Sequence, residues 1–269
     1  MFKSYERKIS LTIWEAIKLL LKLILYSILI GVAIQIIARV INVNGDHPMV
    51  DILGSIISLI LIILIVNRDY DLSLRSNLAF RKMDLKMVPS LIIIVLGINI
   101  VMSEIINYIV MLIPISEFLI KAFSGLINEE ESIVWSIMRI AIVAPIVEEI
   151  FMRGILLDGL LRRYSAIKAI IVSALLFGIW HANIYQFATA LAFGLLLGWI
   201  YFKTRSLLLC IIGHAVNNSL GFIIGGLFNL RIAGYTAEGF QPLWFTGMGA
   251  ALIIIGLMIF KKRLISHWR

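Results

Sequence analysis

The chain has 269 residues, of which 61% are hydrophobic and 15% charged, and its formal net charge is +8. Soluble globular domains carry about 25% charged residues, so this composition excludes an ordinary soluble domain and indicates a membrane protein. The single cysteine, Cys210, excludes an internal disulfide and a metal site built from several cysteines.

Eight apolar segments follow one another along the chain, most of them near the ~20 residues that a helix needs to cross a bilayer. They cover approximately residues 18–41, 50–66, 87–113, 133–158, 166–183, 185–202, 206–227 and 243–260. The first segment has a removable signal peptide as its alternative, but no small-residue cleavage pattern follows it. We therefore predict an all-α polytopic membrane protein of about eight transmembrane helices, with residues 1–269 in a single membrane domain.

Lysine and arginine favour cytoplasmic loops, and here they alternate from loop to loop. They gather in the N-terminal tail, in loop 67–86, at Arg162 and Arg163, at Lys203 and Arg205, and in the C-terminal tail. The intervening loops are nearly free of them, which predicts that both termini are cytoplasmic. The positive charge is thus explained by the membrane topology. The chain contains no basic run interleaved with aromatic residues, which would indicate a nucleic-acid partner.

Between the third and fourth segments, residues 115–130 carry apolar side chains at helical spacing. This pattern predicts a short helix lying in the outer membrane interface.

The segments from 133 to 227 contain polar side chains that are costly in a bilayer. A charge at the centre of a bilayer costs about 3 kcal/mol, so an intramembrane ionisable group is a functional candidate. The main polar set is Arg139, Glu148, Glu149, Arg153, Asp158, His181, His214, Asn217 and Asn218.

The fourth segment contains the sequence "APIVEEIFMRG". Glu149 and Arg153 are four residues apart on one helix face and can form an ion pair. Glu148 is rotated by about 100° from Glu149 and points elsewhere. Pro145 removes a main-chain donor and predicts a kink that opens backbone groups nearby. The spacing therefore predicts one glutamate neutralised by arginine and one left free.

Four polar side chains on three segments lie at a similar depth in the membrane. With a rise of 1.5 Å per residue, Glu148 and His181 lie about 21 and 24 Å from the charged ends of their helices. His214 and Asn218 share a helix face and lie about 14 and 20 Å from theirs. Phe177 lies one turn below His181 and is expected to restrict its ring. The sequence thus predicts that three helices deliver these groups to one site.

A carboxylate, two imidazoles and an amide suit the hydrolysis of an amide bond. A buried carboxylate is a competent general base toward water, and imidazole and amide groups can donate hydrogen bonds to an oxyanion. No serine stands in a GxSxG context, and Cys210 has no placed base. We therefore predict attack by water that Glu148 activates, without a covalent nucleophile.

Three motifs, "EEIFMR" (Glu148–Arg153), "FGIWH" (Phe177–His181) and "HAVNN" (His214–Asn218), resemble the ordered motifs EExxxR, FxxxH and HxxxN of the CPBP family. This is the family of CAAX proteases and bacteriocin-processing intramembrane proteases, also called Abi. The resemblance implies a catalytic helix core at 132–227. It leaves 1–131 as variable N-terminal helices and 228–269 as an outer loop with the last helix.

The resemblance also implies the roles of the motif residues in a glutamate-dependent endopeptidase. Glu148 activates water that His181 helps to bind or orient, and His214 and Asn218 stabilise the oxyanion. Glu149, Arg153 and Phe177 support the site.

The family is often described as metalloproteases, which raises the question of a metal. Catalytic zinc usually has three protein ligands and a water, and Glu148, His181 and His214 could supply three. No HExxH helix is present. We favour a metal-free glutamate mechanism and keep zinc as the alternative cofactor.

The expected partners are membrane lipids and a peptide or membrane-anchored protein substrate, and the expected location is a bacterial plasma membrane. One rival function is a non-catalytic immunity protein that binds a bacteriocin-like peptide. Another is a transporter or haem-binding bundle. Transporters usually show matching repeats in their halves, whereas the polar residues here crowd into the second half.

Overall fold

The computed structural model describes residues 10–41, 48–70, 84–119, 133–227 and 231–267, and every element assigned there is a helix. The longer helices are α1 (Ile13–Val40), α2 (Pro48–Tyr70), α4 (Val88–Leu112), α9 (Ala166–Trp180), α10 (Ile184–Thr204), α11 (Leu207–Gly221) and α12 (Leu243–His267). The turn η1 (Leu85–Met87) leads into α4, and η4 (Phe222–Leu227) continues α11. The prediction of an all-α fold is confirmed.

The fourth predicted segment is one continuous helical rod that contains two π-helical stretches. It consists of α6 (Ile133–Ser136), η2 (Ile137–Val143), α7 (Ala144–Glu149), η3 (Ile150–Leu157) and α8 (Asp158–Leu161). Both η2 and η3 are π-helical, so α7 with its two glutamates lies between two wide turns. Such π turns inside α-helices occur frequently at functional sites.

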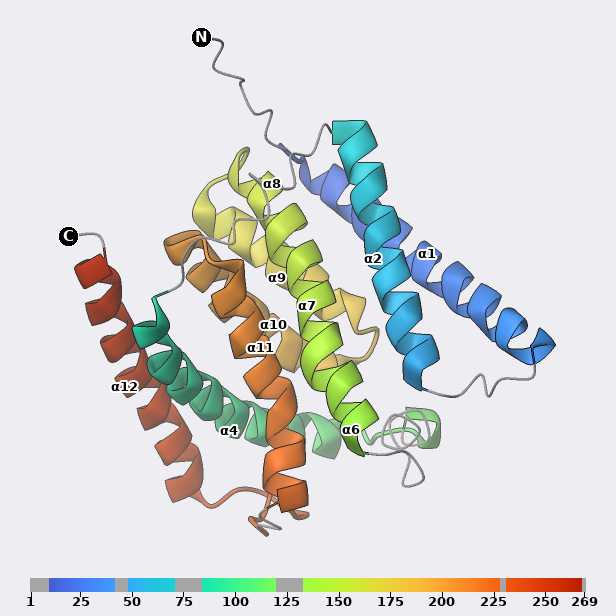
Figure 1. The fold of residues 1–269 in the computed structure, drawn as a ribbon. Helices are drawn as coiled ribbons and strands as arrows, with labels where there is room; N and C mark the ends of the chain where they lie inside the picture. Colours follow the sequence, from blue (N-terminus) through green and yellow to red (C-terminus); the bar gives the residue numbers. More distant parts are fainter. Residues whose placement is uncertain (1–9, 42–47, 71–83, 120–132, 228–230, 268–269) are drawn as a thin grey trace.

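The helices pack as pairs on either side of a central group (Figure 1). The most extensive contacts join α4 to α12, α9 to α10 and α1 to α2. Figure 1 shows α1 and α2 at one edge, α12 at the other, and the α6–α8 rod with α9, α10 and α11 between them. The first turn of α1 and the last turn of α12 point to the same side of the bundle.

Six helices of the described residues are long and apolar enough to cross a membrane. They are Ile13–Val40, Met49–Tyr70, Leu85–Leu112, Ile184–Thr204, Leu207–Ile224 and Leu243–Ile265, and α9 is a shorter apolar helix. A polytopic membrane protein is thus confirmed, while the count of eight spans and the cytoplasmic termini stay predictions. Most of the helix predicted at 115–130 falls on 120–132, outside the described residues.

Two charged side chains near the ends of the bundle have partners that the sequence analysis did not identify. Arg139 Nη1 lies 2.6 Å from Asp51 Oδ2, which joins the α6–α8 rod to α2. Asp158 is buried, and its two oxygens lie 2.6 Å from Arg162 Nη2 and 2.8 Å from Arg205 Nη1. These ion pairs explain how both charges are accommodated.

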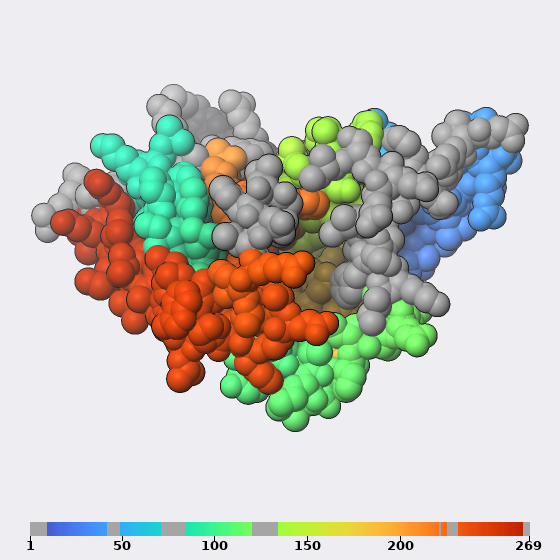
Figure 2. All heavy atoms as spheres, turned by 90° about the horizontal axis from the view of Figure 1, so that it is seen from below, coloured from blue at the N-terminus to red at the C-terminus, as the bar shows by residue number. Residues whose placement is uncertain are grey.

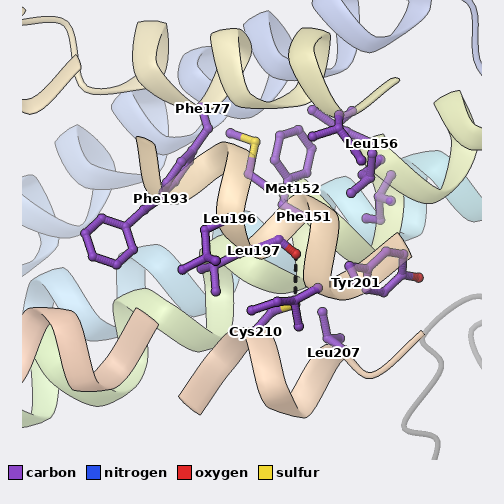
Figure 3. Close-up of a cluster of buried hydrophobic side chains, with 14 of the residues drawn as sticks. Phe151, Met152, Leu156, Phe177, Phe193, Leu196, Leu197, Tyr201, Leu207 and Cys210 are labelled. Carbon is purple, nitrogen blue, oxygen red and sulfur yellow. Dashed lines mark hydrogen bonds between the residues drawn. The ribbon is translucent and has the colours of Figure 1, made fainter. Parts of the chain in front are cut away.

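The hydrophobic core lies beside the α6–α8 rod, where α9, α10 and α11 converge on it (Figure 3). Phe151, Phe193 and Leu197 are buried there. Cys210 is fully buried in the same cluster and its sulfur lies 3.4 Å from the Leu197 carbonyl oxygen, as expected for a small apolar residue. This packing fixes the helices that carry the polar site.

Candidate active site

The predicted ion pair between Glu149 and Arg153 forms, and it is completely enclosed. Arg153 Nη1 lies 2.7 Å from Glu149 Oε1, and the two side chains are 1% and 0% exposed. The Arg153 guanidinium also lies over the Phe177 ring, with Cζ 4.8 Å from the ring centroid. Its Nη2 atom is 3.5 Å from the carbonyl oxygen of Gly194 on α10. Arg153 thus ties the rod to α9 and α10.

The close approach of α9 and α10 at this level depends on Gly194. A Cβ atom there would lie 2.9 Å from Cα and Cβ of Ala174. The missing side chain lets the Gly194 carbonyl face Arg153, which agrees with the frequent use of small residues between membrane helices.

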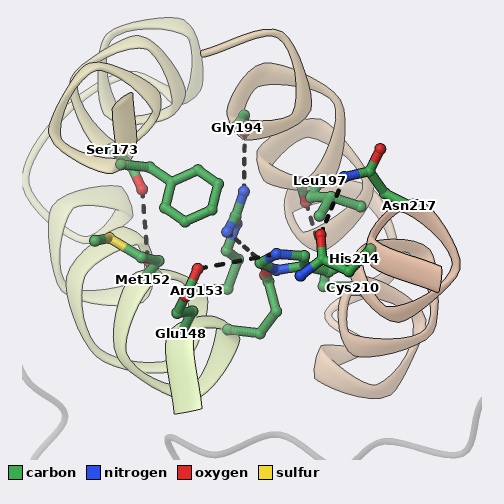
Figure 4. Close-up of polar contacts among 12 residues, drawn as sticks. Glu148, Met152, Arg153, Ser173, Gly194, Leu197, Cys210, His214 and Asn217 are labelled. Carbon is green, nitrogen blue, oxygen red and sulfur yellow. Dashed lines mark hydrogen bonds and ion pairs between the residues drawn. The ribbon is translucent and has the colours of Figure 1, made fainter. Parts of the chain in front are cut away.

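His214 contacts both glutamates of α7, and Figure 4 shows it beside Glu148 and Arg153. Its Nδ1 atom is 2.8 Å from Glu149 Oε1, and its Nε2 atom is 3.8 Å from Glu148 Oε2. Because the carboxylate of Glu149 accepts a hydrogen bond, Nδ1 carries a proton. The Nε2 atom therefore faces Glu148 at a distance that leaves it free to bind a third group.

Glu148 differs from its neighbour as the spacing predicted. Its side chain is 18% exposed, against 0% for Glu149, and no arginine pairs with it among the described residues. Its Oε2 atom is buried and has no hydrogen-bond partner in that part of the chain. Buried polar atoms nearly always have a partner, so this oxygen is a candidate to hold a water or a substrate group.

His181 caps the end of α9 with its ring held on two sides. Its Nδ1 atom lies 2.9 Å from the carbonyl oxygen of Phe177, and the two rings meet edge to face with centroids 5.0 Å apart. Asn183 Nδ2 donates to the His181 carbonyl oxygen, and the Asn183 side chain caps α10. With Nδ1 donating to a carbonyl, Nε2 of His181 is left as a hydrogen-bond acceptor.

Asn218 is held by a main-chain carbonyl that Pro145 leaves open. In the π turn, the Ala144 N–H bonds to the carbonyl oxygen of Arg139, five residues back. The next acceptor in that register, the Ile140 carbonyl, faces residue 145, which is proline and has no N–H. Asn218 Nδ2 donates to the Ile140 oxygen instead, at 2.9 Å. A backbone carbonyl that Pro145 leaves open is thus taken by a motif residue, and in the π register it is that of Ile140, whereas α-helical spacing predicts that of Ala141.

A cavity of about 300 Å³ lies beside these groups. His181, His214 and Asn218 contribute to its wall, and Glu148, which is not a lining residue, has its Oε2 atom 3.8 Å from Nε2 of His214. The full lining is Ile106, Phe177, His181, Tyr185, Gln186, Thr189, Ala190, Phe193, His214, Asn217 and Asn218. The cavity wall is mostly apolar and includes several polar side chains, as is typical of ligand sites.

The donor set was tested for its fit to zinc. The described residues contain no group of three or more His, Cys, Asp or Glu side chains arranged to hold a metal ion. Glu148 and His214 are 3.8 Å apart, and the Nδ1 atom of His214 is engaged by Glu149. We therefore derive no step through a metal; the metal-free mechanism stays a prediction, with zinc as its alternative.

Sequence reasoning missed two features of the site. The bond between Glu149 and His214 joins residues on different helices, and no spacing rule indicates it. A polar stripe on α4, with Asn99 bonded to Asn217 at 3.1 Å, was also missed. Its signal was visible in the sequence, because Asn99, Ser103 and Asn107 recur at helical spacing in an apolar helix.

Comparison with known proteins relates part of this chain to a protein family. Residues 130–220 match the family model of the type II CAAX prenyl endopeptidase Rce1-like proteins. Among curated proteins and among solved structures, none matches the chain. The matched segment contains all three motifs, and the predicted relationship to the CAAX proteases is confirmed.

Proposed function

We propose, from the premise that residues 130–220 place this protein in the family of CAAX endopeptidases, that it hydrolyses a peptide bond of a membrane-associated peptide or protein. The protease class follows from the family. The residues that perform the reaction and the substrate are the finer part of the proposal. One observation carries it: His214, from α11, lies between the paired Glu149 and the free Glu148 at the edge of a cavity within the helix bundle.

The attacking group in this mechanism is a water molecule activated by Glu148. The carboxylate removes one proton from water while the oxygen attacks the carbonyl carbon of the scissile bond. His181 Nε2 accepts a hydrogen bond from the same water and orients it. The unpartnered Oε2 atom of Glu148 supports its role as the base.

The negative charge that develops on the substrate oxygen is stabilised by His214 and Asn218. His214 can donate from Nε2 only when both of its nitrogens carry protons, since Nδ1 already donates to Glu149. The Glu149 carboxylate stabilises that doubly protonated ring by its charge. Preorganised donors of this kind often supply the largest single contribution to catalysis.

The reaction is completed when the tetrahedral intermediate collapses. The bond from carbon to nitrogen breaks, and the proton that Glu148 took from water passes to the leaving amine. The products are a carboxylic acid and an amine, which ionise to a carboxylate and an ammonium group once released, and Glu148 returns to its charged form. No external oxidant or reductant is needed.

A membrane-embedded site selects substrates that enter the bilayer. We propose a leader peptide, a peptide signal or a membrane-protein tail in a bacterial plasma membrane as the substrate class. The mostly apolar wall of the cavity supports a substrate with apolar side chains near the cleaved bond.

The test compares purified wild type with Glu148→Gln in lipid vesicles, using a library of quenched fluorogenic membrane peptides. Wild type is expected to cleave, and Glu148→Gln to lose at least ~10²-fold in kcat, the usual size of a general-base contribution. The melting temperature is expected to stay unchanged. Parallel samples with a chelator test the zinc alternative, which predicts loss of activity. A Glu148→Gln variant with full activity would contradict the proposed mechanism.

A further inference from the structure

A chain of hydrogen bonds runs from the outer segment, residues 231–242, to Asn218. Tyr235 Oη donates to Asn99 Oδ1 at 2.7 Å, and Asn99 Nδ2 donates to Asn217 Oδ1 at 3.1 Å. Asn217 Nδ2 donates to Asn218 Oδ1 at 3.1 Å. Every bond points the same way, from the phenol of Tyr235 toward the amide on the cavity wall.

We propose that Tyr235 and Asn99 are positioning residues for peptide-bond hydrolysis, and that they act through Asn217 by fixing which end of the Asn218 amide faces the cavity. Neither residue lies within the segment 130–220 that matches the protease family. The inference rests on the proposed function, because it assigns these residues to the same reaction.

The orientation of the Asn218 amide matters because its two ends have opposite chemistry. The nitrogen donates and can stabilise an oxyanion, whereas the oxygen accepts and would repel one. Asn217 donates to the Asn218 oxygen, and this bond disfavours the flipped amide, in which the nitrogen and oxygen of Asn218 exchange places. The Asn218 nitrogen has two hydrogens, of which one binds the Ile140 carbonyl and the other is left for the substrate.

The common direction of the bonds strengthens this effect. Each of the two upstream amides accepts a hydrogen bond at its oxygen and donates one from its nitrogen. Chains of hydrogen bonds in a low-dielectric interior polarise one another, which makes the last donor stronger. The chain therefore sets both the direction and the donor strength of Asn218.

The outer segment is itself fixed to α4, so Tyr235 starts from a defined position. Asn107 Nδ2 donates to the Gly234 carbonyl oxygen at 2.7 Å, and Gln241 N donates to Glu104 Oε2 at 2.9 Å. Figure 2 shows the orange-red outer segment lying beside the green end of α4. Burial raises the pKa of Tyr235 above its ordinary value, so its hydroxyl keeps the proton that it donates.

The first test measures kcat and KM of Tyr235→Phe and Asn99→Leu. The probe is a quenched fluorogenic peptide that wild type cleaves in phosphatidylglycerol-containing vesicles. We expect kcat to fall about fivefold for Tyr235→Phe and about tenfold or more for Asn99→Leu, as for the loss of one and two buried hydrogen bonds. KM is expected to stay unchanged.

The matched control is Tyr108→Phe. Tyr108 is half exposed on α4 and packs against Phe240 of the outer segment, with ring centroids 4.9 Å apart. It takes no part in the chain of bonds, so its variant is expected to keep the wild-type kcat. An equal loss in Tyr108→Phe and Tyr235→Phe overturns the proposal.

A double-mutant cycle separates positioning from general damage to the fold. If Tyr235 acts through Asn218, then Tyr235→Phe has no further effect on kcat in an Asn218→Ala background. Two losses that multiply independently overturn the proposal, even if each single variant is impaired.

A measurement without catalysis keeps this inference apart from the proposed function. In protein with ¹⁵N-labelled asparagine side chains, the Asn218 amide resonance is identified by its loss in Asn218→Ala. Tyr235→Phe is expected to shift that resonance and Tyr108→Phe to leave it in place. An unmoved resonance overturns the hydrogen-bond chain. A wild type that cleaves nothing contradicts the proposed function instead, and the resonance still decides whether the chain orients Asn218.

Discussion

The Nδ1 atom of His214 lies 2.8 Å from Oε1 of Glu149, the same oxygen that holds Arg153 at 2.7 Å. One oxygen atom of Glu149, the second glutamate of the motif, therefore makes two contacts with different roles. It neutralises a buried arginine, and it fixes the proton position on His214, a residue of the proposed site. Adjacent Glu148 pairs with no arginine of the described residues and approaches His214 only at 3.8 Å, so the two glutamates are expected to respond differently to the same substitution.

The first prediction concerns stability. Glu149→Gln leaves the Arg153 charge buried without its partner, and breaking an enclosed pair costs about 3 to 5 kcal/mol. Thermal melts in detergent are expected to show a clear loss for Glu149→Gln and none for Glu148→Gln. Equal melting temperatures for the two variants would contradict the structural role of Glu149.

The second prediction separates the two jobs of Glu149. A double variant, Glu149→Gln with Arg153→Met, removes both charges, and replacing a buried pair by neutral groups often preserves stability. The melting temperature is expected to return toward wild type. Activity is not, because a neutral glutamine cannot stabilise the doubly protonated His214 ring by charge.

The size of that loss can be measured as kcat of the double variant on a peptide that wild type cleaves. We expect a fall of about 10²-fold, as for removal of one oxyanion donor. Recovery of activity together with stability would show that the charge on Glu149 serves folding alone.

A third prediction concerns Asp158, whose buried carboxylate joins Arg162 and Arg205. Both arginines are partly exposed and can be rehydrated, so Asp158→Asn is expected to cost only about 1 to 2 kcal/mol. Because this cluster lies at the end of the rod, kcat should stay unchanged. The control is Asp69→Asn at the exposed end of α2, which is expected to leave the melting temperature unchanged. A loss of kcat in Asp158→Asn at full stability would assign the cluster to the site.

The sequence predicts the local features of this protein well. All eight apolar segments are helical, and the division between a paired Glu149 and a free Glu148 follows from helical spacing alone. Both depend on neighbours within one turn, where geometry is nearly constant. The same holds for Phe177 below His181.

The features that were missed depend on how separate helices rotate and slide against one another. The turn before Pro145 is π-helical, so the carbonyl that Pro145 leaves open is that of Ile140, and Asn218 from another helix caps it. Neither the turn nor its partner can be read from the residues around Pro145. Asn99 lies on α4, outside the motif-bearing segments 133–227, and its polar stripe has helical spacing, but no local rule indicates that it faces Asn217 of α11.

The last prediction concerns the contact between α4 and α12, which carries Asn99 and the end of the outer segment. A Cβ atom on Gly97 would lie 2.6 Å from the Gly249 carbonyl oxygen and 2.8 Å from the Ile253 nitrogen. Both are main-chain atoms that cannot rotate away, so Gly97→Ala must separate the helices. We expect a loss of about 1 to 3 kcal/mol, the usual cost of overpacking.

The matched control is Gly247→Ala on α12, where an added Cβ meets nothing within 4 Å. There the better helix propensity of alanine is expected to raise stability by about 0.5 to 1 kcal/mol. Thermal melts of the two variants should therefore move in opposite directions from wild type. If Gly97→Ala is as stable as Gly247→Ala, the two helices do not pack through their glycines. The position of Asn99 beside α11 would then need another support.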